Sequence, residues 1–228
     1  RLDETLAFGL EDSAPAGAAT IYAAHPGERP VFSAGVLVEG WAERGDGIWE
    51  ADLPKGLESV NSLYDGEGML PRARGQGFVP AAEGTPWTMS YPEGAVPGDL
   101  DVEHAELAIV PHYPWAMSVL PVERMDPETR TVEVAVPGTY PLDQPTFGRF
   151  PEGSAWIENV LDVLDEPGEW CVDRKAGKLY LMSKKDEPGD IFAPVLTELV
   201  RVEGEIDYAG PEDTPVRNLV FRGLTFTH

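Results

Sequence analysis

Glycine and proline punctuate this chain from end to end, and they restrict its fold more than any other feature. The 228 residues include 24 glycines and 22 prolines, spread along the sequence rather than gathered into one linker. Proline interrupts helices and central strands, and glycine favours turns. The segments between them are short, which predicts many short strands and little helix.

Short apolar or alternating segments lie between these turn residues at regular spacing, which is the pattern of an all-β protein. Two intervals, residues 126–130 and 173–179, combine proline or glycine with polar residues and predict β-hairpins. The predicted strands are residues 5–8, 20–23, 30–32, 36–38, 48–53, 106–110, 131–136, 169–173, 178–182, 200–202 and 216–226.

Two regions depart from this pattern. Residues 156–164 repeat apolar side chains at helical spacing, and Pro167 follows them, so we expect one short helix there. Residues 75–105 are rich in glycine and proline and poor in β-branched residues, so we expect a long surface loop.

The charge of the chain excludes several classes of function. There are 40 acidic and 17 basic residues, and the formal net charge is −23. Nucleic-acid binding needs a basic surface, and anionic lipid also attracts basic segments, so we expect neither partner. The longest apolar runs, such as residues 107–110, are too short to span a membrane.

Cofactor motifs are missing from the sequence. Cys171 is the only cysteine, which excludes an intrachain disulfide and a cysteine zinc site. The four histidines lack ligand spacing, and there is no phosphate-binding glycine loop or serine-hydrolase elbow. We therefore expect no cofactor. Calcium is the one open alternative, because five carboxylates lie close together in sequence, although a solvated loop explains them equally. They are Glu203, Glu205, Asp207, Glu212 and Asp213.

Several segments resemble a family of bacterial right-handed parallel β-helix proteins that carry an N-terminal β-rich insertion domain. The most specific match is residues 164–170, Leu-Asp-Glu-Pro-Gly-Glu-Trp, which resembles the family's Leu-Asp-x-Pro-Gly-Glu-Trp. Residues 24–35 resemble its Pro-Gly-Glu-x-Pro-Val-x-Ser-Gly-Gly segment, although Ala34 stands where the family has glycine. Residues 62–74 and 218–226 are similar to further family segments.

The resemblance implies a mainly β architecture with a domain inserted into a solenoid. We expect an N-terminal β-helix coil over residues 1–41 and a sandwich-like or barrel-like insertion domain over residues 42–205. A returning coil is expected over residues 206–228. The end of that coil is apolar and lacks a polar cap, so we expect further coils of the same protein to stack on it.

Some members of this family are glycoside hydrolases whose carboxylate pairs lie in later coils. The resemblance therefore implies the non-catalytic N-terminal portion of a secreted, periplasmic or cell-surface protein, inactive alone, that shapes or supports a polysaccharide cleft. Its expected partners are a polysaccharide or oligosaccharide and the remaining coils. Two alternatives stay open: a glycan-binding module without catalysis, and a purely structural cell-surface domain.

Glu158 and Glu169 are the candidates for catalysis within this chain. Glycoside hydrolysis needs two carboxylates about 5–9.5 Å apart, and both residues have apolar or aromatic neighbours that can raise a carboxyl pKa. Both also lie in segments typical of turns and caps, and we favour that structural interpretation.

Candidates for substrate binding are aromatic and basic. His112 and Trp115 belong to the densest aromatic patch, and Trp87 lies in the glycine-rich region, so these rings are candidates for stacking on sugars. Arg72 and Arg74 share one face of a strand and offer bidentate bonds to a uronate or sulfate. Core packing for the aromatic residues and salt bridges for the arginines are the competing interpretations.

Overall fold

The computed structural model describes residues 1–98 and 100–228, and the prediction of a mainly β chain is confirmed. Within the described residues, the helical elements are two short 3-10 turns, η1 (Leu10–Asp12) and η2 (Leu161–Val163), and no helix is long and apolar enough to cross a membrane. The chain forms two compact units: unit 1 (Arg1–Leu37 with Phe192–His228) and unit 2 (Val38–Ile191).

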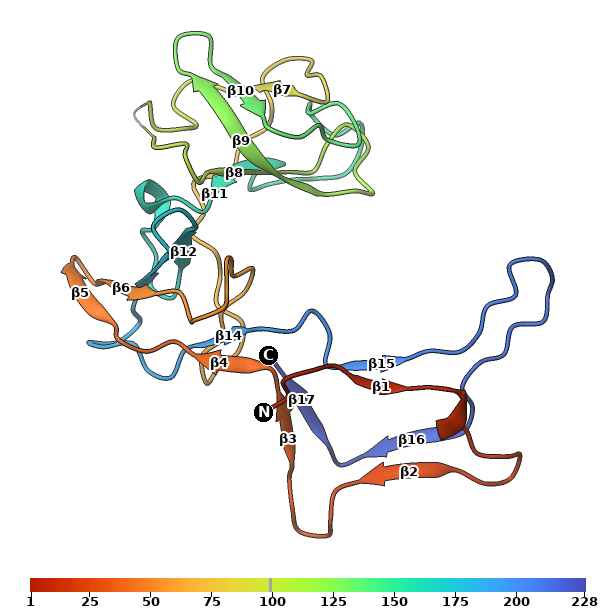
Figure 1. Cartoon of the computed structure of the whole chain (residues 1–228). Helices are drawn as coiled ribbons and strands as arrows, with labels where there is room; N and C mark the ends of the chain where they lie inside the picture. Colours follow the sequence, from red (N-terminus) through yellow and green to blue (C-terminus); the bar gives the residue numbers. More distant parts are fainter. Residues whose placement is uncertain (99) are drawn as a thin grey trace. The chain divides into compact units, whose positions relative to one another are not determined.

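Unit 1 joins the first and last parts of the chain through three parallel strand pairs (Figure 1). The three strands follow the same order in both segments. The pairs are β1 (Leu6–Phe8) with β15 (Val200–Val202), β2 (Thr20–Ala23) with β16 (Leu219–Arg222), and β3 (Val31–Ser33) with β17 (Thr225–Thr227). An antiparallel pair of β4 (Gly35–Leu37) with β14 (Phe192–Pro194) follows.

Aromatic rings contact one another between the strands of unit 1. The Phe8 ring lies 5.0 Å from Tyr22 and 5.0 Å from Phe221, and Phe32 stacks on Phe226 at 5.3 Å. The two contacts of Phe8 link the β1–β15 pair to the β2–β16 pair. The contact between Phe32 and Phe226 lies within the β3–β17 pair. The aromatic packing therefore reinforces the parallel pairing.

Unit 2 contains two antiparallel sheets. The first has the strand order β11-β8-β9-β10-β7, and the second has the order β12-β13-β6-β5. The strands of the first sheet are β7 (Thr88–Ser90), β8 (Glu106–Ile109), β9 (Ser118–Asp126), β10 (Thr131–Val134) and β11 (Ala155–Glu158). Those of the second are β5 (Ala42–Gly45), β6 (Ile48–Asp52), β12 (Trp170–Asp173) and β13 (Lys178–Met182).

The hydrophobic core of unit 2 includes side chains from one face of the first sheet; burial alternates along β10, whereas every residue of β8 is buried. Leu107 and Ile109 of β8 are buried, and so are Val132 and Val134 of β10. Successive side chains of a strand point to opposite faces, so these apolar residues share the inner face of the sheet.

Two short polar segments form the predicted hairpins. Asp126 pairs with Thr131 at the end of β9–β10, and Asp173 pairs with Lys178 at the end of β12–β13. Both hairpin predictions are confirmed. The single strand expected over residues 216–226 is instead divided into β16 and β17, because Gly223 takes φ +69 between them.

The helix predicted over residues 156–164 is wrong. Ala155–Glu158 form strand β11, which pairs with β8, and only the short turn η2 follows. Ala155 and Ile157 are buried while Trp156 is partly exposed, so the burial period is that of a strand. The helix prediction relied on apolar residues three to four positions apart and overlooked the alternation of neighbouring residues within the strand.

The surface loop predicted over residues 75–105 is also partly wrong. Phe78, Met89, Tyr91 and Val96 are buried, and β7 joins the five-stranded sheet. The N–H of Phe78 donates to the carbonyl of Ala155 at 2.8 Å. Backbone bonds and scattered apolar anchors thus hold a segment that is poor in β-branched residues.

Asn159 is a buried polar residue that the fold requires. It is 1% exposed and has φ +66, and its amide nitrogen donates to the carbonyls of His104 (2.9 Å) and Val172 (3.2 Å). Its amide oxygen accepts from the N–H of Val172 at 2.9 Å. Asparagine tolerates this left-handed backbone better than most residues do.

We expect Asn159→Ala to lower the free energy of unfolding by about 2–4 kcal/mol, because it leaves buried backbone groups without hydrogen-bond partners and places alanine at positive φ. Urea denaturation measures the loss. Asn159→Gly removes the same hydrogen bonds but accepts the backbone angle, so it should lose less. A larger loss with glycine would contradict the role assigned to the backbone.

Candidate functional site

Two loops of unit 2 start from one place in the five-stranded sheet. Ile109 pairs with Ser118 on one side and with Ala155 on the other. The start of the loop after β8 therefore lies beside the end of the loop that leads into β11. The N–H and hydroxyl of Thr146 both donate to the carbonyl of His112 at 3.0 Å. The N–H of His112 donates to the carbonyl of Pro141 at 3.2 Å. These bonds fasten the loops to each other.

The joined loops carry an aromatic cluster, which we define as Tyr113, Trp115, Tyr140 and Phe147. Tyr113 and Trp115 stack at 4.7 Å with an interplanar angle of 18°. Tyr140 meets both rings edge-on at 4.9 and 6.0 Å, and its hydroxyl accepts from the Trp115 indole N–H at 3.3 Å. Phe147 lies 6.2 Å from Trp115.

This cluster is held in place and yet open to solvent. Trp115 is 66% exposed and Phe147 is 60% exposed. Core packing, the competing interpretation of Trp115, does not describe a side chain with that exposure. Rings that are already fixed by neighbours would lose little freedom on meeting a ligand.

A polar groove adjoins the aromatic cluster. It has a volume of about 650 Å³, and its polar lining is Glu83, His112, Asp143, Gln144 and Thr146. His112 Nδ1 lies 2.9 Å from Asp143 Oδ1, and Asp143 is 9% exposed. The His112 ring also meets Tyr113 edge-on at 4.7 Å. His112 therefore belongs to both the groove and the edge of the cluster.

Trp87 lies on a separate turn that is tied to the same loop. It is 49% exposed, and Thr85 Oγ1 accepts from the N–H groups of Trp87 and Thr88. The N–H of Gly138 donates to the carbonyl of Pro86 at 2.8 Å. The turn thus supports the loop that carries Tyr140, and the described ring contacts of the cluster do not include Trp87.

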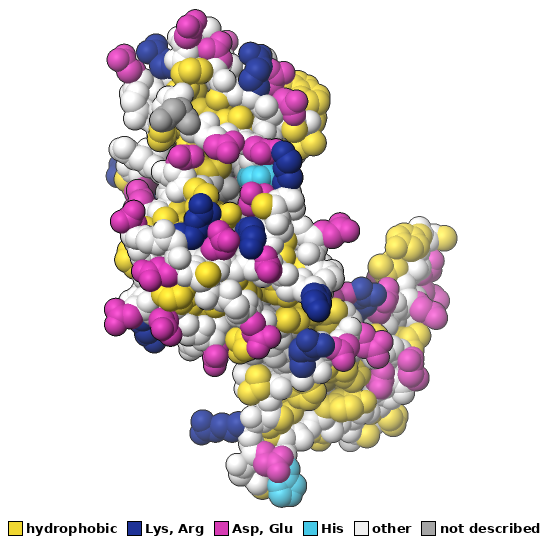
Figure 2. Space-filling model, turned by 60° about the vertical axis from the view of Figure 1, so that its left-hand side comes forward, with side chains coloured by type: hydrophobic (Ala, Val, Ile, Leu, Met, Phe, Trp, Pro, Cys, Tyr) yellow, Lys and Arg dark blue, Asp and Glu magenta, His cyan; other side chains and the backbone are white. Residues whose placement is uncertain are grey.

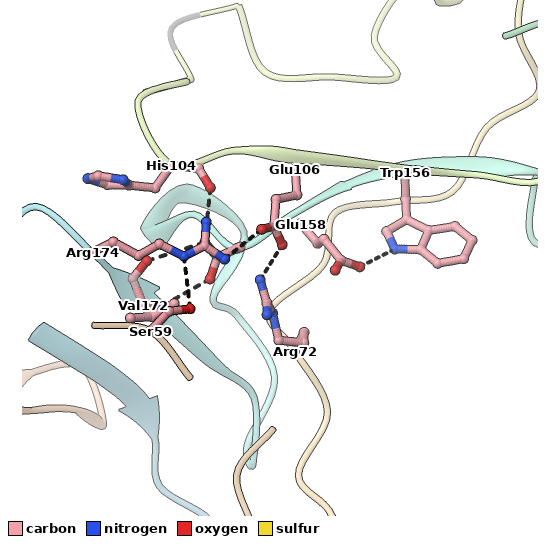
Figure 3. A network of polar contacts seen from close by, with 9 residues as sticks. Ser59, Arg72, His104, Glu106, Trp156, Glu158, Val172 and Arg174 are labelled. Atoms are coloured by element: carbon pink, nitrogen blue, oxygen red, sulfur yellow. Dashed lines mark hydrogen bonds and ion pairs between the residues drawn. The ribbon is translucent and has the colours of Figure 1, made fainter. Parts of the chain in front are cut away.

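Arg72 lies in a different place, within a network of ion pairs (Figure 3). Glu106, which is 8% exposed, accepts from Arg72 at 2.5 Å and from Arg174 at 2.8 Å. The Arg72 guanidinium lies 4.9 Å from the Trp170 ring centre. Arg174 also donates to Ser59 at 3.2 Å. The Arg72 side chain is therefore engaged with protein partners rather than turned toward solvent.

Arg74 and Glu158 are brought together through Trp156. The Arg74 guanidinium lies 5.0 Å from the Trp156 ring centre. The Trp156 indole N–H donates to Glu158 at 2.8 Å, as Figure 3 shows. Arg74 also contacts Glu152 at 3.4 Å. These contacts make the partly exposed ring of Trp156 a support for both charged groups.

Glu169 is buried at the edge of the same region. It is 4% exposed, and its carboxylate accepts from the backbone N–H groups of Arg74, Asp165 and Glu166 at 3.3–3.4 Å. Burial raises the pKa of Glu169 above its ordinary value, while the three N–H groups oppose the shift. Burial likewise raises the pKa of the Cys171 thiol to about 12.

The structure thus unites His112 and Trp115 at one site and gathers Arg72, Arg74, Glu158 and Glu169 in another region. Our sequence-based selection did not include Tyr140, Asp143 or Phe147. They lie in a stretch where aromatic residues alternate with prolines, which indicates rings presented on a turn-rich surface. Among the described residues, no group of three or more His, Cys, Asp or Glu is placed to hold a metal ion.

No protein-family model and no curated protein matches this chain. A solved structure described as "Glycoside hydrolase" matches its fold, with a TM-score of 0.75 and 22% sequence identity. The match covers 100% of this chain and 41% of the glycoside hydrolase chain. The fold of this chain is therefore similar to part of a glycoside hydrolase, and the chain spans less than half of that protein's length.

The raised pKa of Glu169 leads to a prediction for stability. A folded state with a raised carboxyl pKa binds the proton more tightly than the unfolded state does, so stability falls as pH rises from the ordinary value of 4.5 to the raised value. Glu169→Gln cannot titrate. We expect the unfolding free energy of the wild type, relative to this variant, to decrease between about pH 4 and about pH 7.

Urea denaturation at both pH values measures the difference. Glu166→Gln, in the same turn, is the control for losing one negative charge from an acidic chain. If the two variants changed by the same amount relative to the wild type, burial of the Glu169 carboxylate would not be the cause.

Proposed function

We propose that this chain is the non-catalytic N-terminal portion of a carbohydrate-active parallel β-helix protein, and that unit 2 helps to bind and shape a polysaccharide. The observation that carries the proposal is the match of the entire chain to part of a glycoside hydrolase with a TM-score of 0.75. A polysaccharide substrate implies a secreted, periplasmic or cell-surface location.

The pairing within unit 1 supports the β-helix part of the proposal. Strands β1, β2 and β3 pair in parallel with β15, β16 and β17 in the same order. Consecutive coils of a β-helix stack in this way, each strand lying on its counterpart one coil earlier. We infer that the two segments of unit 1 are consecutive coils and that unit 2 is an insertion between them.

The contacts of the two candidate acids support a non-catalytic role. Glu158 accepts from the Trp156 indole, and Glu169 accepts from three backbone N–H groups. A general acid and its partner need access to the substrate across a cleft. Glu169 is nearly inaccessible, and its bonds fix the turn between η2 and β12.

The exposed aromatic cluster supports glycan contact, either within a larger cleft or as a binding module by itself. A sugar ring has apolar C–H faces and a polar rim of hydroxyls. The cluster offers aromatic faces, and the adjoining groove offers hydrogen-bonding side chains, which together match both parts of a sugar. An exposed tryptophan beside a groove weighs against the purely structural alternative.

We expect Trp115→Ala to weaken polysaccharide binding by about tenfold or more, the equivalent of about 1.4 kcal/mol, because it removes the central ring of the cluster. Isothermal titration against a panel of soluble polysaccharides measures the affinity. Tyr208→Ala is the matched control, since Tyr208 is an aromatic residue of unit 1 that is 93% exposed. Absence of binding by the wild type, or equal affinity after both Trp115→Ala and Trp87→Ala, would contradict glycan contact.

We also expect the 228-residue chain to release no reducing ends from any polysaccharide of the panel, because Glu169 is buried and bonded to backbone N–H groups, which leaves Glu158 without it as an accessible partner carboxylate. A reducing-sugar assay over long incubation tests this. Turnover that disappears in Glu158→Gln or Glu169→Gln would show that the chain carries its own catalytic carboxylates.

A further inference from the structure

The groove beside the aromatic cluster has an unbalanced charge. Glu83 and Asp143 are among its lining residues, and its described lining contains no lysine or arginine. The formal net charge of the chain is −23, so its long-range field adds to the local one. An anionic ligand entering this groove meets like charges without a fixed cation to offset them.

The arginines elsewhere in unit 2 are largely engaged by carboxylates. Arg72 and Arg174 share Glu106, Arg124 pairs with Glu133 at 2.7 Å, and Arg130 contacts Glu93 at 3.5 Å. Basic side chains likewise lie among acidic ones on the face shown in Figure 2. Bidentate binding of a uronate or sulfate needs a guanidinium whose donors are free. Arg149, on the loop that carries Phe147, is exposed but does not line the groove.

The polar groups of the groove suit hydroxyls instead. A carboxylate such as Asp143 only accepts hydrogen bonds, and a sugar hydroxyl can donate one to it. Gln144 and Thr146 can both donate and accept. Asp143 is held by His112 at 2.9 Å and is largely buried, so its position is set before a ligand arrives. The groove thus offers acceptors to a ligand that carries many O–H donors and no negative charge.

We propose that this site selects uncharged glycans, whose rings stack on the aromatic cluster and whose hydroxyls bond to the groove, and that it rejects polysaccharides carrying carboxylate or sulfate groups. The inference rests on the proposed function, because it names the class of glycan for the same site. The sequence analysis offered Arg72 and Arg74 as residues that bind a charged sugar. The proposal assigns the selection to Glu83 and Asp143 instead, which repel a charged sugar.

The test compares polymers that share a backbone and differ in charge. Suitable pairs are fully methyl-esterified against de-esterified polygalacturonate, unsubstituted xylan against glucuronoxylan, and agarose oligosaccharides against sulfated galactan oligosaccharides. Titration of the 228-residue chain should give at least tenfold higher affinity for the neutral member of whichever pair binds. In about 1 M salt, where the Debye length falls to about 3 Å, the preference should shrink, because charge rather than shape produces it.

Glu83→Gln is the decisive variant, because Glu83 is exposed and its loss should not disturb folding. It should raise the affinity for the charged polymer severalfold and change the affinity for the neutral one much less, because the glutamine amide keeps a hydrogen-bond acceptor for a sugar hydroxyl. Asp143→Asn should also raise binding of the charged polymer, with a cost to neutral binding because it changes the contact with His112. Glu123→Gln is the matched control, because Glu123 is an exposed residue of β9 that does not line the groove and has no described ion pair.

The outcomes separate the two proposals. If no polymer binds, the proposed glycan contact fails and the selectivity fails with it. If glycans bind but the charged member binds equally or better, glycan contact stands and the selectivity is overturned; loss of that binding in Arg149→Gln would identify the cation responsible. A neutral preference that Glu83→Gln leaves unchanged, or that about 1 M salt leaves unchanged, would also overturn the electrostatic mechanism.

Discussion

The pairing of β4 with β14 is the constraint on which the rest of the chain depends. Gly35–Leu37 run antiparallel to Phe192–Pro194, and the N–H of Val38 donates to the carbonyl of Ile191 at 2.8 Å. Unit 2 therefore leaves and rejoins the path of unit 1 at one place. The entropy of closing such a loop grows only with the logarithm of its length. A long insertion is thus compatible with parallel pairing between segments at opposite ends of the chain.

Two buried polar residues perform a related task inside unit 2, where they connect its two sheets. Glu106 extends from β8 to Arg174, which follows β12, and Asn159 follows β11 and bonds to Val172 of β12. Apolar packing alone does not specify how one sheet is placed on another, whereas hydrogen bonds demand particular partners. A buried ion pair adds little net stability, so the role we assign to Glu106 is to fix this placement.

Local chemistry explains which parts of the fold could be predicted. The hairpins ending at Asp126 and Asp173 depend on turn residues that are adjacent in sequence, and strands with clear alternation were found for the same reason. The strand at Ala155–Glu158 was mistaken for a helix because its periodicity is short and two competing patterns overlap. The segment containing Phe78 and Met89 looked like a loop, since its burial comes from distant partners that a single sequence does not reveal.

The candidate site shows the same division between local and distant information. Trp115 and His112 could be selected because they are neighbours in an aromatic patch, whereas Tyr140 and Asp143 join them only through the pairing of Ile109 with both Ser118 and Ala155. The acidic composition argues against nucleic acid as a partner but does not by itself indicate a ligand. In the proposed glycan site, the same acidity is informative when it is combined with fixed aromatic rings: the attractive forces we propose are stacking and hydroxyl bonding, and negative charge on a ligand is unfavourable.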